Sequence, residues 1–258
     1  PSSGPDVADT GGAGFGGNAA IRVQNGGSLS TTAGVTVEAN GRGGFGLVQS
    51  GNGTGGTAEI DAAGTGVTLQ AGTVAINATG IGGGGLAVDP TLGARPSQNG
   101  GDGTGGTATL RFRAIGTSTI SLGDTTLDVS GTGGDSGQSS TPAGENATGG
   151  NARGGNATVT KSGANTAQLA SLRVDASAES GAAYSGSGFT GFTGDAQGGT
   201  IDVSSAGAGS VLNLAGGSII LGASGTASSA GRENAGSGTG GSIAVSATNG
   251  GSLTGIRS

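Results

Sequence analysis

The stretch 105–112 reads GGTATLRF, and it decides the fold because five other stretches repeat its pattern. In each copy a Gly-Gly pair precedes a small polar or β-branched residue and an alternating run of apolar and polar residues. The copies begin near residues 16, 55, 105, 154, 198 and 240 and read GGNAAIRV, GGTAEIDA, GGTATLRF, GGNATVTK, GGTIDVSS and GGSIAVSA. Their spacings of 39, 50, 49, 44 and 42 residues indicate a fixed core with variable insertions.

The alternation has the same phase in every copy. The residues two and four positions after each pair are apolar: Ala19 and Ile21, Ala58 and Ile60, Ala108 and Leu110, Ala157 and Val159, Ile201 and Val203, and Ile243 and Val245. Because a period of two places alternate side chains on opposite faces of a strand, each copy is predicted to form a strand with one buried face.

Two further short strands are predicted after this first one. The second carries the pairs Val67 and Leu69, Ile120 and Leu122, Ala167 and Leu169, and Leu212 and Leu214. The third carries Val35 and Val37, Val74 and Ile76, Leu127 and Val129, Leu172 and Val174, and Ile219 and Leu221. Three short strands per repeat predict an all-β fold, a right-handed parallel β-helix (solenoid) of roughly triangular cross-section. The pattern allows one coil per repeat, or two if the insertions also contribute strands.

Long Gly-rich insertions separate the repeat cores. They lie near residues 1–15, 40–54, 79–104, 131–153, 178–197 and 223–239. One interpretation is a solvated loop, the usual behaviour of Gly/Ser-rich sequence. The other is close backbone packing, because glycine permits polyglycine-II-like contacts. Phe15, Phe45, Phe189 and Phe192 lie in these insertions and are expected to pin them to the core.

The composition excludes several kinds of function. The 258 residues include 64 Gly and no Cys, His, Trp or Met, and the formal net charge is −6. A sparse negative charge disfavours nucleic acid, and no apolar run reaches the length of a membrane-spanning helix. We therefore expect no nucleic-acid partner, no direct membrane insertion, no cofactor, and no catalytic, cofactor-binding or metal-binding residues. Residues 1–258 are interpreted as one repeat-array segment of a longer protein.

Three other features of the sequence suggest different functions. The glycines of the stretch 100–106 lack the helix that a nucleotide-binding loop requires. The stretches Gly100-Gly101-Asp102 and Gly133-Gly134-Asp135 begin like a calcium-binding nonapeptide, but the aspartate is misplaced and no tandem array follows. Outward charges could serve a carbohydrate-active β-helix enzyme, although none has a His beside it. These outward charges are Asp61 and Asp202, Arg22 and Arg111, and Glu38, Asp128 and Asp175. Tyr184 is the only tyrosine of the chain.

The phrases GGTATL, GGNATV and GGTAEI, each leading into Val/Leu-alternating strands, resemble the large β-strand-repeat surface proteins of Gram-negative bacteria. These are filamentous-haemagglutinin-like and autotransporter-type adhesins. The resemblance implies an extracellular, outer-membrane-associated structural segment that acts in adhesion, biofilm or surface-fibre formation. It implies self-association into fibres or layers, or host-cell or matrix carbohydrate or protein ligands. The alternatives are a carbohydrate-binding or carbohydrate-active β-helix and a calcium-dependent repeat module.

Overall fold

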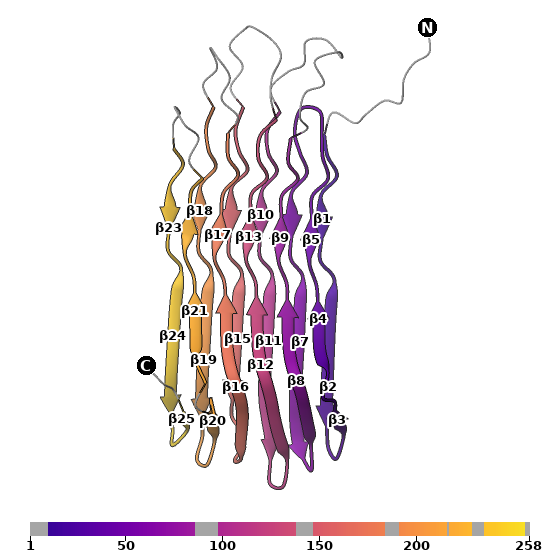
Figure 1. Cartoon of the computed structure of the whole chain (residues 1–258), viewed down its shortest axis with the longest axis vertical. Coiled ribbons are helices and arrows are strands. Elements are labelled where there is room, and N and C mark those ends of the chain that lie inside the picture. The colour runs from indigo at the N-terminus through magenta and orange to yellow at the C-terminus, as the bar shows by residue number, and fades with distance from the viewer. Residues whose placement is uncertain are drawn as a thin grey trace, which may run out of the picture.

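The strands of the described residues belong to four sheets, and successive repeats enter these sheets in the same order. The computed structural model describes residues 10–85, 98–137, 147–183, 191–215, 217–228 and 235–255, which contain strands and no helix. Figure 1 shows the repeats side by side, with long strands in the lower half and short ones in the upper half. Every pairing between these strands is parallel and in register.

We number the sheets I to IV in the order in which a repeat enters them. Sheet I contains β1 (Gly14–Phe15), β6 (Gly53–Thr54), β10 (Gly103–Thr104), β14 (Ala152–Arg153), β18 (Ala196–Gln197) and β23 (Gly238–Thr239). Sheet II contains β2 (Asn18–Gln24), β7 (Thr57–Thr65), β11 (Thr107–Ile115), β15 (Asn156–Lys161), β19 (Thr200–Ala206) and β24 (Ser242–Thr248).

The other two sheets form the opposite layer. Sheet III contains β3 (Ser28–Ser30), β4 (Gly34–Glu38), β8 (Thr68–Asn77), β12 (Thr119–Asp128), β16 (Thr166–Asp175), β20 (Val211–Asn213), β21 (Ile219–Gly222) and β25 (Ser252–Thr254). Sheet IV contains β5 (Gly41–Arg42), β9 (Gly80–Ile81), β13 (Gly131–Thr132), β17 (Ala178–Glu179) and β22 (Gly225–Thr226). Repeats 1 to 6 begin at β1, β6, β10, β14, β18 and β23.

The apolar core lies between sheets II and III. In repeats 2 to 5 the predicted inward residues of sheet II, such as Ile60 and Leu110, are at most 2% exposed, and they pack with Leu69 and Ile76 of sheet III. Those of repeat 1 are half-buried, and Ile243 and Val245 of repeat 6 are 47% exposed. Burying a large aliphatic side chain contributes about 1.5–3 kcal/mol, so this half of each repeat supplies most of the hydrophobic stabilisation. The phase predicted from the Gly-Gly pairs is therefore confirmed for the first strand.

The predicted second and third strands lie on one sheet rather than at a corner. They are continuous in β8, β12 and β16 and split only in repeats 1 and 5. In β8 the alternation breaks at Gly72 and Thr73, which are both exposed, while Ala71 and Val74 are both buried. The alternation therefore shifts phase by one residue here, and the pairing of β8 with β12 leaves out Gly72 and Gly123 together, with the register unchanged on either side. The triangular cross-section predicted from three strands is wrong for this reason: two layers face each other.

Sheets I and IV pack backbone against backbone. A Cβ added to Gly53 would lie 1.9 Å from the Ile81 carbonyl oxygen across the layers, and one added to Gly103 would lie 1.9 Å from that of Thr132. Side chains essentially never come so close, so glycine is required at these two positions. The equivalent positions of repeats 4 and 5 are Ala152 and Ala196, which form a small buried cluster with Ala178. The ends of the Gly-rich insertions are thus packed strands. Their central parts, 86–97, 138–146, 184–190 and 229–234, lie outside the described residues.

Hydrogen bonds join the two glycine layers from repeat to repeat. Glycines that precede strands of sheet I alternate with glycines that follow strands of sheet IV. The backbone N–H of each glycine donates to the carbonyl oxygen of the glycine before it in this series. The donor–acceptor pairs are Gly44–Gly12 (2.8 Å), Gly51–Gly44 (2.8 Å), Gly83–Gly51 (2.9 Å), Gly101–Gly83 (2.9 Å), Gly134–Gly101 (2.8 Å), Gly150–Gly134 (2.8 Å) and Gly181–Gly150 (2.9 Å). We call this series the glycine spine. It satisfies backbone groups that lie between layers and outside either sheet ladder.

The Gly-Gly pair occupies the junction between the wide and narrow halves, and each of its residues has a separate reason to be glycine. A Cβ on Gly105 would lie 1.8 Å from the Val129 carbonyl oxygen of the opposite layer. A Cβ on Gly106 would lie 2.1 Å from the Gly56 carbonyl oxygen of the preceding repeat. The Gly106 N–H also donates to the Ala78 carbonyl, 2.6 Å away, so the pair ties repeat 3 to both layers of repeat 2.

This geometry predicts opposite outcomes for one substitution at equivalent positions. Gly106→Ala should lower the free energy of unfolding by about 2 kcal/mol or more, because its methyl group overlaps the preceding backbone. Gly17→Ala should change it by less than about 0.5 kcal/mol, because a Cβ there meets nothing within 4 Å. Urea denaturation followed by circular dichroism measures both. Equal losses for the two variants would contradict the close-packing explanation.

Candidate functional site

A polar groove crosses sheet I and sheet II along the line of Gly-Gly pairs. It has a volume of about 500 Å³, and its floor is formed by the pairs of repeats 4 to 6 and by Gly105. The walls are Thr104, Arg153 and Gln197 on one side and Asn156, Thr200 and Ser242 on the other. The groove exists because the glycines leave a gap between two rows of outward side chains.

A second hollow of about 470 Å³ adjoins the groove over sheet I. A ladder of Asn and Asp side chains runs beneath it, in which each oxygen accepts the backbone N–H of the next repeat. The donor–acceptor pairs are Asp102–Asn52 (2.9 Å), Asn151–Asp102 (2.8 Å), Asp195–Asn151 (2.9 Å) and Ser237–Asp195 (2.7 Å). Hydrogen bonds from the Ser237 backbone and hydroxyl lower the pKa of Asp195. Asp102, which the sequence placed in a motif that begins like a calcium-binding nonapeptide, belongs to this ladder, because it pairs with Asn52 and with Asn151.

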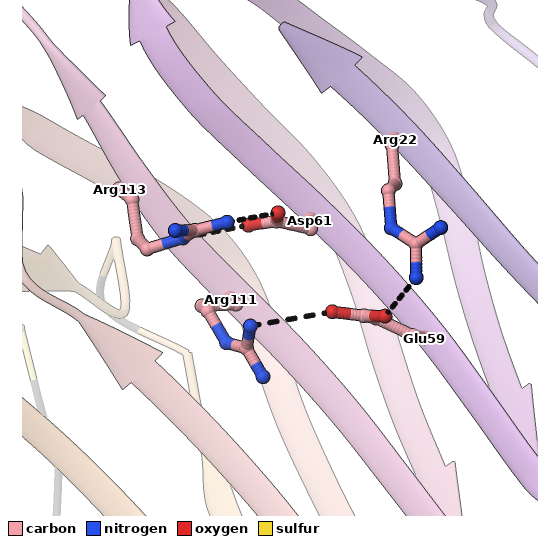
Figure 2. A network of polar contacts seen from close by, with 5 residues as sticks. All are labelled: Arg22, Glu59, Asp61, Arg111 and Arg113. Atoms are coloured by element: carbon pink, nitrogen blue, oxygen red, sulfur yellow. Dashed lines mark hydrogen bonds and ion pairs between the residues drawn. The ribbon is translucent and has the colours of Figure 1, made fainter.

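The outward charges of sheet II form ion pairs between neighbouring strands (Figure 2). Glu59 contacts Arg22 at 2.9 Å and Arg111 at 3.4 Å, on the strands either side of it. Arg113 binds Asp61 through two contacts, one of them an Nε–Oδ1 hydrogen bond of 3.2 Å. The Asp61 side chain is 2% exposed, and its hydrogen bond and charge raise the pKa of Arg113. Each of these two carboxylates is thus engaged by arginine.

Among the other charged residues named from the sequence, Glu38, Asp128 and Asp175 lie in one row of sheet III. Asp128 pairs directly with Asp175 on one side and with Asn77, the partner of Glu38, on the other. Asp128 and Asp175 accept hydrogen bonds from the Ser130 and Ser177 backbones just after their own strands. Asp202 lies opposite Thr158 and Ala244 in sheet II, two positions out of register with Asp61. Within the described ranges, no three or more His, Cys, Asp or Glu side chains gather where they could hold a metal ion. Tyr184 lies outside those ranges.

The expected pinning role of the phenylalanines is wrong for Phe15 and Phe45. Phe15 is 77% exposed and Phe45 is 57% exposed, because both lie on outward-facing positions of the narrow half, where no cavity can receive a ring. Phe192 is half-buried, and its backbone bridges to that of Thr148. Phe189 lies outside the described residues.

Lys161, the only lysine of the chain, was missed by the sequence interpretation. It is 1% exposed and lies on the inward face of β15, in register with Phe112 and Ser205. Its Nζ donates a hydrogen bond to the Gly163 carbonyl, and burial lowers its pKa to about 8. The alternation could have predicted the burial of this lysine, because Lys161 lies six residues after Gly155, at an inward position.

No family model, curated protein or solved structure matches the chain. Among the described residues, none forms a helix that is long and apolar enough to span a membrane.

The lowered pKa of Lys161 predicts that the free energy of unfolding rises with pH. Its folded pKa of about 8 lies below the ordinary value of 10.5, so between these values the unfolded state binds more protons and folding is favoured as pH increases. The melting temperature should be flat from pH 7 to 8 and rise between pH 8 and 10. Differential scanning calorimetry across this range measures the slope.

Two variants control this prediction. Lys161→Met should have a flat profile with a higher melting temperature at pH 7, since the desolvated charge is gone. Lys161→Arg should have a flat profile with a low melting temperature, because the arginine stays charged throughout this pH range. A wild-type profile that follows that of Lys161→Met would contradict the assignment.

Proposed function

We propose that the chain is a right-handed β-solenoid segment of a large secreted bacterial surface protein, and that it acts structurally in adhesion, biofilm or surface-fibre formation. The observation that carries this proposal is the shared register of the repeats. Corresponding residues of successive repeats pair in parallel through all four sheets, so the repeats stack as one continuous array. Parallel strands joined through crossover connections are almost always right-handed.

Several physical features support a structural role. Each repeat is held to the next by strand ladders, the glycine spine and the Asn/Asp ladder, so its interactions are with neighbours in the stack. The outward side chains of sheets I and II vary from repeat to repeat, while the inward residue four positions after each Gly-Gly pair is always Ile, Leu or Val. The GGTATL-type phrases resemble those of filamentous-haemagglutinin-like and autotransporter-type adhesins, which are large exported proteins of the outer surface.

Localisation tests the proposal directly. Antibodies raised against the purified segment should label intact, unpermeabilised cells of the producing organism. External protease should remove that signal. A strain lacking the segment should adhere less to surfaces or form less biofilm, while a cytosolic control protein stays unlabelled and intact. Labelling that requires permeabilisation would refute a surface role.

A second candidate function is the binding of an extended polysaccharide, and the polar groove favours it. The groove crosses several repeats, and its walls carry hydroxyl, amide and guanidinium groups that can hydrogen-bond sugar hydroxyls. Phe15 lies on the same outward row as Thr54 and Thr104, three repeats before Arg153. Its exposed ring supplies a surface on which a sugar can stack.

Binding of soluble polysaccharides, measured on a glycan array and by calorimetry, tests this candidate. The double variant Arg153→Ala/Gln197→Ala should weaken binding about tenfold or more, since each lost hydrogen bond to a charged or polar group is worth about 0.5–3 kcal/mol. Arg42→Ala removes a similarly exposed arginine from sheet IV and should have no effect. Equal effects of the two changes would exclude the groove.

A further inference from the structure

The floor of the polar groove is the line of Gly-Gly pairs, and close backbone packing keeps this floor free of side chains. A Cβ on Gly155 would lie 2.0 Å from the Gly106 carbonyl oxygen, and one on Gly199 would lie 2.0 Å from that of Gly155. The pairs recur at residues 16–17, 55–56, 105–106, 154–155, 198–199 and 240–241. Every repeat therefore adds one bare rung to the floor.

The wall of the groove on sheet II is a single row of polar residues. The first residues after the successive pairs are Asn18, Thr57, Thr107, Asn156, Thr200 and Ser242, and they pair in register across the sheet. They differ only among Asn, Thr and Ser, whereas the next outward row includes Ala20, Glu59 and Asp202. The row beside the groove thus presents a hydroxyl or amide group about every 4.8 Å along the stack.

The side chains of the groove walls have unused hydrogen-bonding capacity. Among the described residues, none of these wall side chains has a hydrogen-bond or ion-pair partner: Thr104, Arg153, Gln197, Asn156, Thr200 and Ser242. Polar side chains of the opposite layer bond to the next repeat instead. The Asn40 Oδ1 atom accepts the Thr79 backbone N–H at 2.9 Å, and the Ser30 hydroxyl donates to the Gln70 side chain at 3.2 Å. The groove therefore gathers donors and acceptors that are available to a ligand.

The charges around the groove disfavour a ligand with many negative charges. Arg153 is the only charged residue of the groove walls, and its register partners are Thr104 and Gln197. Asp102 and Asp195 lie two residues before those partners and line the adjoining hollow, so there is an acidic residue on each side of Arg153. Hydrogen bonds from the next repeat lower the pKa of Asp195, which is therefore ionised at neutral pH. One guanidinium group is thus flanked by two carboxylates, and a polyanion is repelled.

We propose that the groove binds a neutral, linear polysaccharide that lies parallel to the stack axis and hydrogen-bonds to each repeat that it crosses. The proposal rests on the polysaccharide-binding candidate above and deepens it by naming the charge of the ligand and its direction. Sugar hydroxyls both donate and accept, so they match walls that mix hydroxyl, amide and guanidinium groups. Because each repeat contributes few contacts, affinity accumulates over several repeats.

Two series of oligosaccharides of increasing length test the proposal, neutral cello-oligosaccharides and acidic oligogalacturonates. In isothermal titration calorimetry the affinity for the neutral series should rise about tenfold or more from the shortest member to the longest. Raising the ionic strength should not change this affinity, because the ligand has no charge to be screened. The acidic series should bind about tenfold more weakly, or less, at every length.

A pair of matched double variants places the ligand. Asn156→Ala/Thr200→Ala removes an amide and a hydroxyl from the groove wall in neighbouring repeats, and it should weaken binding of the longest cello-oligosaccharide about tenfold or more. Gln168→Ala/Thr126→Ala removes the same two kinds of group from neighbouring repeats on the outward face of sheet III. This control should bind like wild type.

A third variant tests the charge argument. Asp102→Asn/Asp195→Asn should raise the affinity for oligogalacturonates about tenfold, because it removes both carboxylates beside Arg153. The ladder is preserved in this variant, since Asn151 already accepts a backbone N–H at the equivalent position. Circular dichroism should show the same melting temperature within a few degrees.

Two kinds of result separate this proposal from the candidate function beneath it. Stronger binding of oligogalacturonates than of cello-oligosaccharides would overturn the neutral ligand, while polysaccharide binding itself would stand. An affinity that does not grow with length, or equal losses in the groove variant and its control, would overturn the placement along the groove. Binding of neither series would overturn the proposal, and a glycan array that is also negative would end the candidate function.

Discussion

The close approach of two backbone layers at the Gly-Gly pairs is the constraint on which the rest of the structure depends. The first glycine of a pair meets the opposite layer and the second meets the preceding repeat, as Gly105 and Gly106 show. Because neither position has room for a Cβ, the pair fixes the separation of the layers and the stacking of the repeats together. The phase of the strand that follows is then set, since the first inward residue always lies two positions later.

The same constraint divides each repeat into two halves with different sources of stability. Sheets II and III enclose aliphatic side chains and gain from the hydrophobic effect. Sheets I and IV enclose almost no side chains and depend on dispersion between backbones and on hydrogen bonds of the glycine spine and the Asn/Asp ladder. Ordering glycine costs more conformational entropy than ordering any other residue. The narrow half is therefore stable only as part of the stack, attached to the apolar half.

The sequence predicted the apolar half well because alternation with period two is a strong signal there. It placed Ile60 and Leu110 inward, but it read the phase shift at Gly72 and Thr73 as a corner between two strands. A phase shift and a corner look alike in sequence, and only the pairing of β8 with β12 separates them. The strands of the narrow half gave no apolar pattern, since their inward residues are Gly and Ala. The contact of Arg113 with Asp61 was missed because it joins positions two residues out of register in neighbouring repeats.

Hydrogen exchange of individual glycine amides, followed by NMR spectroscopy, tests the central claim most directly. The amides of Gly83, Gly101 and Gly134 lie in Gly-rich sequence, yet each donates to a carbonyl across the two layers at 2.8 or 2.9 Å. They should exchange as slowly as the amides of β11, because both report opening of the stack. Exchange at the rate of unprotected glycine, with β11 still protected, would show that the narrow half is not a packed layer and would contradict the account.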